Sequence, residues 1–174
     1  MNLQWFRVPE KIYCKKACLP VALEELKYIL NKQKVLIATS LEMQKQGMLK
    51  PITDKLNELN IAYAVHDVST GMTNAVKIFE PDCILAFGAD IQIFLAQKLW
   101  IDYEYPDLNP EIIMDKPELL ANMLLQSSLQ MGKKAYFIAV PCFIGMGSQV
   151  KPFALNLSNN NNNNNNIFFA DMSI

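Results

Sequence analysis

Two residues of this sequence are of a type and in a place that could support nucleophilic or acid–base chemistry. His66, the single histidine, lies in a β-rich segment, and Cys142 follows Pro141 at the end of another. A thiol nucleophile needs a base beside it, and a histidine metal site needs several imidazoles. Because neither residue has such a partner nearby, we interpret His66 as a satisfied or solvent-facing side chain and Cys142 as structural. We assign no catalytic residue and no metal ligand.

A third candidate is the stretch 81–100, PDCILAFGADIQIFLAQKLW. A short apolar run, the turn residue Gly88 and a segment with helical spacing predict a strand, a tight turn and a helix. Such a junction lies at the carboxyl end of a strand, where helix N–H groups can receive an anion such as a dinucleotide pyrophosphate. One glycine falls short of the usual fingerprint, and Asp90 stands where a phosphate would approach. A phosphate-facing role and plain packing both stay open.

Strand and helix patterns alternate along the rest of the chain. We expect strands at 35–39, 61–68, 83–87 and 134–140, and helices at 19–30, 51–59, 74–80, after Gly88 and at 117–131. Residues 5–16 predict an N-terminal edge hairpin around Pro9, and the proline-rich segment 103–117 predicts a surface loop. The fold class is therefore α/β, an open, mainly parallel sheet with flanking helices.

Composition narrows the function classes. The chain has 174 residues, the length of one domain, and its net charge of −1 argues against a nucleic-acid partner. Apolar runs fall short of the about 18 residues of a membrane span, and four cysteines without a CxxC pair suit reduced, partly buried thiols of a cytoplasmic protein. Eight asparagines at 159–166 mark a low-complexity tail, 158–174, expected to be disordered or loop-like, after which IFFADMSI could return as one short strand.

Four blocks, in this order, carry a resemblance to a known family: KIYCKKACLPVALEEL, VLIATS, PDCILAFGAD and KKAYFIAVPCFIGMGSQVKPFA. The chain resembles the nucleotide-binding half of the iron-containing alcohol dehydrogenases, most of all the alcohol dehydrogenase part of the bifunctional aldehyde-alcohol dehydrogenases. The resemblance implies a Rossmann-like domain over residues 1–157 that binds NAD, and an aldehyde or alcohol as substrate. The family's helical domain, which holds iron or zinc through one Asp and three His, is expected to be absent because the chain stops before it.

The resemblance also implies where a cofactor would bind. The family's GGGS turn corresponds to Gly88, Ala89 and Asp90, followed by Ile91, so a methyl group and a carboxylate replace two glycines. Ser40 stands where the family has an Asp that holds the adenosine ribose. A hydroxyl accepts a hydrogen bond less strongly than a charged carboxylate.

The family's second signature, a loop rich in Thr, Ser and Gly, corresponds to the segment that begins at Cys142. Within it Cys142, Phe143, Gly145 and Met146 take the positions next to the cofactor. Two glycines and a serine are kept, whereas the hydroxyl groups before them are replaced. The loop is expected to keep its path and to lose donors.

Three functions follow as alternatives. The first is a truncated, degenerate iron-containing alcohol dehydrogenase, inactive without a metal-holding second domain. The second is a non-catalytic remnant that acts as an interaction or assembly module, through its edge strand near residues 5–13, with a full-length dehydrogenase or in a homo-oligomer. The third is a Rossmann-like domain that binds another small ligand in the same crevice.

Overall fold

A single parallel sheet organises the computed structural model, which describes residues 9–107, 131–142 and 172–173. Within those residues the strand order is β1-β6-β5-β4-β2-β3, and every pair of neighbours is parallel. The strands are β1 (Lys11–Ile12), β2 (Lys34–Thr39), β3 (Ala62–Asp67), β4 (Cys83–Gly88), β5 (Tyr136–Pro141) and β6 (Met172–Ser173). The expected α/β fold with a parallel sheet is confirmed.

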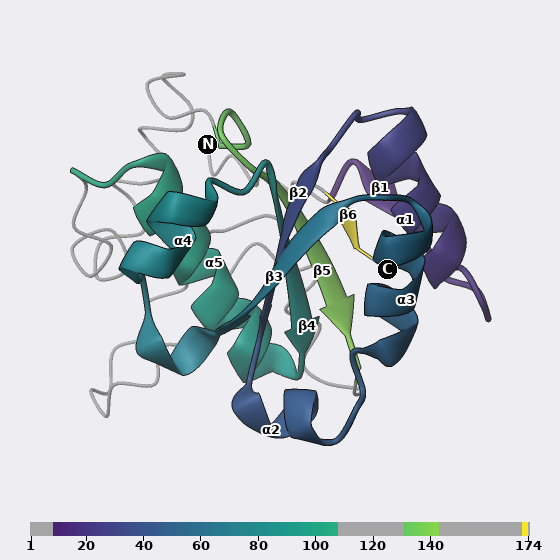
Figure 1. Ribbon diagram of the computed structural model, residues 1–174, viewed down its shortest axis with the longest axis horizontal. Coiled ribbons are helices and arrows are strands. Elements are labelled where there is room, and N and C mark those ends of the chain that lie inside the picture. Colours follow the sequence, from purple (N-terminus) through teal and green to yellow (C-terminus); the bar gives the residue numbers. More distant parts are fainter. Residues whose placement is uncertain (1–8, 108–130, 143–171, 174) are drawn as a thin grey trace, which may run out of the picture.

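Helices cover both faces of the sheet, with α1 and α3 on one side and α4 and α5 on the other (Figure 1). The helices are α1 (Leu19–Tyr28), α2 (Leu41–Lys45), α3 (Lys50–Glu58), α4 (Asn74–Phe79), α5 (Asp90–Glu104) and the short 3₁₀ turn η1 (Val68–Thr70). Strands covered on two faces must be apolar throughout, and all six residues of β4 are buried. The sequence predicted α1, α3 and α4 at nearly these positions, whereas the one-turn helix α2 was not predicted.

The helix α5 lies at the centre of one layer, and each of its fifteen residues is buried or half-buried. Trp100 stacks on Phe137 of β5 with 4.9 Å between ring centroids, and its indole Nε1 donates to the carbonyl oxygen of Ala135 at 2.7 Å. The carboxylate of Glu104 accepts from the backbone nitrogens of Lys134 and Ala135, both at 2.9 Å. These contacts fix the amino end of β5 against the last turn of α5.

Glu104 also explains a wrong prediction. The loop expected from residue 103 begins later, because α5 continues through Glu104. Its carboxylate satisfies two backbone donors at the start of β5, which a loop residue exposed to water would not do. The rest of the expected loop, from 108, and nearly all of the expected helix 117–131 lie outside the described residues.

The amino-terminal segment differs from the expected hairpin. The strand β1 does lie at an edge of the sheet, but it pairs in parallel with β6, from the far end of the chain. Lys11 Nζ and the Tyr13 hydroxyl both contact the buried carboxylate of Glu25 on α1, which ties this segment to the helix layer. A hairpin needs adjacent antiparallel strands, and here the tail supplies the partner. The short strand expected in that tail is confirmed.

Candidate functional site

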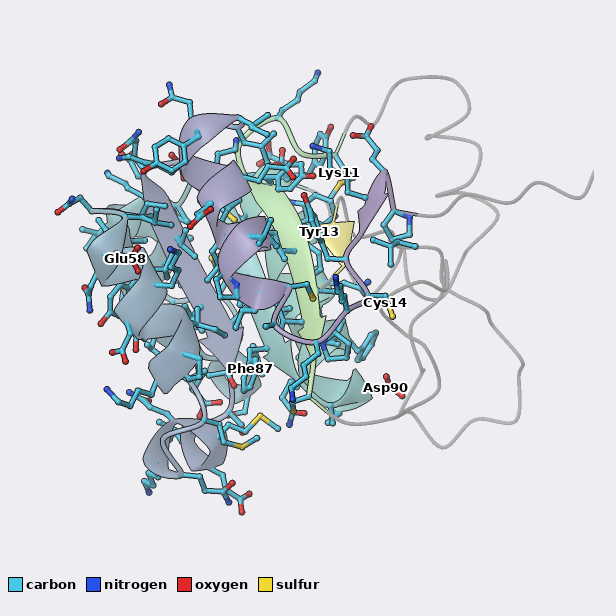
Figure 2. The ribbon with its side chains drawn as sticks, turned by 90° about the vertical axis from the view of Figure 1, so that its right-hand side faces the viewer. Lys11, Tyr13, Cys14, Glu58, Phe87 and Asp90 are labelled. Carbon is cyan, nitrogen blue, oxygen red and sulfur yellow. The ribbon has the colours of Figure 1, made fainter. Side chains whose placement is uncertain are left out.

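The crevice that open α/β sheets use for ligands lies where the chain changes direction in the sheet. From β2 the chain proceeds to β3 on one side and then returns to β4 on the other, so β2 and β4 are neighbours at a topological switch point. Ser40 follows β2 and Ala89 follows β4, both at the carboxyl edge. Figure 2 shows Phe87 and Asp90 at this end of the molecule, far from Glu58. Ligands of doubly wound sheets bind at such a point.

Gly88 is required at its position because α5 begins directly against the end of β4. Its φ is +152°, and a Cβ added there would lie 2.6 Å from Cβ of Gln92. No side chain fits at that distance without moving the first turn of the helix. The predicted strand, turn and helix around Gly88 are therefore confirmed, with a steric reason for the glycine.

The second predicted segment starts beside the first. Strand β5 pairs with β4 so that Pro141 is opposite Gly88, and the backbone nitrogen of Cys142 donates to the carbonyl oxygen of Gly88 at 3.0 Å. Two stretches more than fifty residues apart thus meet at one edge. The other predicted residues of that loop, Phe143, Gly145 and Met146, lie outside the described residues.

The turn between β4 and α5 is closed from within by Gln92. Its side-chain Oε1 accepts a hydrogen bond from the backbone nitrogen of Ala89 at 3.0 Å. This is the reciprocal half of a capping box, in which the third helical residue satisfies the donor of the cap. Asp90 adds a carboxylate to the first turn, where it interacts favourably with the helix dipole. The Ala89 N–H and part of the positive end of the α5 helix dipole are therefore already engaged.

Ser40 has a local role at the other side of the crevice. Its hydroxyl oxygen accepts from the backbone nitrogen of Met43 at 3.4 Å and so caps α2. Ser40 itself is extended, as capping residues usually are. The hydroxyl hydrogen stays available for one further acceptor, since a serine oxygen can accept and donate at once.

Comparison with known protein families identifies the family of this chain. The model described as iron-containing alcohol dehydrogenase matches residues 9–174. The chain belongs to this family. Its relatives include the aldehyde-alcohol dehydrogenase of Clostridium acetobutylicum, 33% identical over 167 residues, which cover 91% of this chain and 19% of that protein. Aldehyde-alcohol dehydrogenase 2 of Entamoeba histolytica is 31% identical, with 88% of this chain and 18% of that protein covered.

Solved structures agree on the fold. The iron-containing alcohol dehydrogenase of Thermococcus thioreducens superposes with a TM-score of 0.71 at 21% identity, over 97% of this chain and 46% of that one. The sulfoacetaldehyde reductase of Bifidobacterium kashiwanohense, solved with NAD+, gives a TM-score of 0.68 at 13% identity over 99% of this chain and 46% of that one. The chain therefore spans less than half of these proteins and less than a fifth of the curated aldehyde-alcohol dehydrogenases.

For an iron-containing family, the ligand-forming side chains are of particular interest. The buried His66 has its Nε2 2.8 Å from the carbonyl oxygen of Gly71, so one ring nitrogen is engaged by the backbone. Its interpretation as a satisfied side chain is confirmed. In the part of the chain that the structure describes, no three His, Cys, Asp or Glu side chains gather as a metal site would require. The described residues also include no helix long and apolar enough to span a bilayer.

Cys142 is half-buried at the crevice, and burial raises the pKa of its thiol above the usual value, against a smaller opposing effect of a backbone hydrogen bond. A thiol nucleophile depends on a lowered pKa, so the environment here favours the unreactive form. This agrees with the structural role assigned from the sequence.

Two glutamines of α5 are features that the sequence search for catalytic types overlooked. Gln92 could have been found, because it stands three residues after the helix cap, where Gln and Glu complete a capping box. Gln97 is 1% exposed, and its side-chain nitrogen and oxygen have no hydrogen-bond partner among the described residues. Nothing in its local sequence pattern distinguishes it from an ordinary residue of a buried helix face.

Proposed function

We propose that this chain forms the nucleotide-binding layer of an iron-type alcohol dehydrogenase and binds an NAD-type dinucleotide weakly. The hydrogen bond from Cys142 to Gly88 carries the proposal, because it joins the two predicted cofactor-binding turns at the switch point of the sheet. The NAD+ complex of a relative with the same fold supports the choice of ligand.

Three features of the crevice argue for weak rather than tight binding. The Ala89 N–H is taken by Gln92, so a diphosphate would have to displace that side chain. The Asp90 carboxylate repels a second anion by about 1 kcal/mol at 4 Å in water, and by more where water is excluded. Ser40 contributes a neutral hydroxyl in place of a charged acceptor for the ribose.

Catalysis requires more than this layer. Bound NADH would supply a hydride to the carbonyl carbon of an aldehyde, and a proton from water would complete the alcohol at the oxygen. A cage of three histidines cannot be built from a chain with one, and that one is held by Gly71. The proposal is therefore that turnover depends on a metal-holding helical domain beyond these 174 residues.

Titration of NADH into the purified chain, followed by its fluorescence, tests the binding proposal. Saturation in the submillimolar to millimolar range, with competition by NAD+, is the expected result. Gly88→Ala is the informative variant, because the added methyl group must move Gln92 and the first turn of α5. Circular dichroism establishes whether that variant is folded. A folded wild-type chain with no saturable binding would refute the proposal.

A second function is favoured by one observation at the sheet edge. Among the described residues, strand β1 lies at an edge of the sheet and carries Ile12, which is 52% exposed. Edge strands with exposed apolar residues offer backbone groups to another chain. The chain would then act as an assembly module, in a homo-oligomer or with a full-length dehydrogenase. Light scattering alone and with such a dehydrogenase distinguishes these cases from a monomer.

A further inference from the structure

Two cysteines lie at the ends of the turn that leads from β1 into α1. The backbone nitrogen of Cys18 donates to the carbonyl oxygen of Lys15 at 3.1 Å, which closes the turn, and Ala17 within it has a φ of +62°. Such a closed turn holds its first and last Cα atoms within about 7 Å. Cys14 directly precedes the turn, and Cys18 is the N-cap residue of α1.

The sulfur of Cys18 points back toward Cys14. Its Sγ lies 3.6 Å from the carbonyl oxygen of Tyr13, whose peptide bond leads into Cys14. In a planar trans peptide this oxygen and the next Cα are about 2.8 Å apart, so Cys18 Sγ lies within about 6.5 Å of the Cys14 Cα. Disulfides join cysteines whose Cα atoms are about 4.4–6.8 Å apart. The Cys18 sulfur thus lies on the side of the turn that carries Cys14, and bond formation requires rotation of both side chains and a shift of the turn.

The two thiols also differ in their exposure to solvent, so that a dissolved reagent reaches one of them before the other. Cys14 is exposed, contrary to the partial burial expected from the sequence, and Figure 2 shows its side chain pointing away from the sheet. Cys18 is half-buried behind it. The exposed residues between them, Lys15 and Lys16, carry two ammonium groups that attract an anionic reagent. Cys83 and Cys142 are buried or half-buried on other elements.

We propose that Cys14 and Cys18 form a reversible intramolecular disulfide by exchange with an anionic low-molecular-weight disulfide of the oxidised-glutathione type. The Cys14 sulfur, after losing its proton, attacks one sulfur of the reagent and releases one equivalent of thiol. The Cys18 sulfur then loses its proton, attacks the Cys14 sulfur of the mixed disulfide and releases the second equivalent. Two protein thiols are oxidised and one reagent disulfide is reduced. The site is independent of the cofactor proposal.

Oxidation changes the contacts that hold β1. The Cys18 thiol loses the hydrogen with which it donates to the carbonyl oxygen of Tyr13. The new disulfide also displaces Cys14, the residue that follows Tyr13. The Tyr13 hydroxyl contacts Glu25, as does Lys11 of β1. The redox state of the pair is therefore coupled to the edge strand that the second proposed function uses.

Mass spectrometry of the full chain tests the proposal. After incubation with oxidised glutathione, alkylation and cleavage after glutamates, residues 11–24 should be released unalkylated and about 2 Da lighter than the reduced peptide. Cys18→Ser should instead accumulate a stable glutathione adduct on Cys14, and Cys14→Ser should lose most of the reaction at Cys18. Cys83→Ala, on β4, is the matched control and should oxidise like the wild type.

Three results would overturn this inference. The first is a wild-type chain in which both thiols stay alkylatable. The second is a persistent adduct in the wild type as large as in Cys18→Ser, since the fold would then not bring Cys18 to the adduct. The third is equal oxidation rates in the folded and the guanidinium-unfolded chain, because the turn would then contribute nothing.

Discussion

The side-chain oxygen of Gln92 lies 3.0 Å from the backbone nitrogen of Ala89 and accepts a hydrogen bond from it. In the proposed binding mode, this contact occupies the backbone donor that would face a diphosphate at the turn after β4. It also stabilises the start of α5, so the same side chain supports the fold and opposes the ligand.

Replacing Gln92 by alanine should tighten NADH binding a few-fold and weaken the fold. The Ala89 N–H becomes available to the diphosphate, while the loss of half a capping box lowers the free energy of unfolding by about 0.5–1 kcal/mol. NADH fluorescence and urea unfolding measure the two effects. Gln33→Ala, just before the amino end of β2, is the control and should leave NADH affinity unchanged. Weaker binding in Gln92→Ala would show that this side chain contacts the ligand favourably.

Asp90→Asn should raise NADH affinity up to about fivefold at low salt, since removal of the carboxylate relieves roughly 1 kcal/mol of repulsion. The gain should shrink as salt is added, because mobile ions screen the wild-type repulsion. Asp54→Asn removes an equivalent charge from an exposed ion pair with Lys50 on α3 and serves as the control. An equal response of the two variants would mean that net charge, and not the position of Asp90, sets the affinity.

Glu104→Ala should lower the free energy of unfolding by about 2–3 kcal/mol. Glu104 is 5% exposed, and its carboxylate accepts from the backbone nitrogens of Lys134 and Ala135, of which the nitrogen of the buried Ala135 would lose its partner. Urea denaturation measures the loss. Glu58→Ala, on the exposed face of α3, should stay within about 0.5 kcal/mol of the wild type. A Glu104 variant as stable as this control would contradict the assigned role.

Alkylation of Cys142 should depend on pH differently in the folded and unfolded chain. Burial raises the pKa of this thiol when the chain folds, so at a given pH near or below that pKa the folded protein holds less of the reactive thiolate. The folded-state rate should therefore rise at higher pH than the rate in guanidinium. The same shift makes the fold lose stability as pH rises above the unfolded thiol pKa, because the unfolded state then releases its proton first. Alkylation rates of Cys142 with the same pH dependence in the folded and the unfolded chain would contradict the raised pKa.

Much of the architecture could be read from local sequence. Strands β2, β4 and β5 are buried on both faces and therefore read as continuous apolar runs. Helices α1 and α3 are buried on one face and therefore show apolar residues at helical spacing. The short helix α2 escaped because one turn carries too little periodicity. The pairing of β1 with β6 escaped because it joins residues about 160 positions apart.

By itself, the sequence determined the α/β class, the family and the strand-to-helix turn at Gly88, because residue types and spacing encode these. Only the tertiary structure decided that Cys142 meets Gly88, that Gln92 engages Ala89 and that Cys18 points back toward Cys14. Hydrogen bonds between specific atoms depend on how strands pair and how a turn closes. No local pattern of residue types contains that geometry.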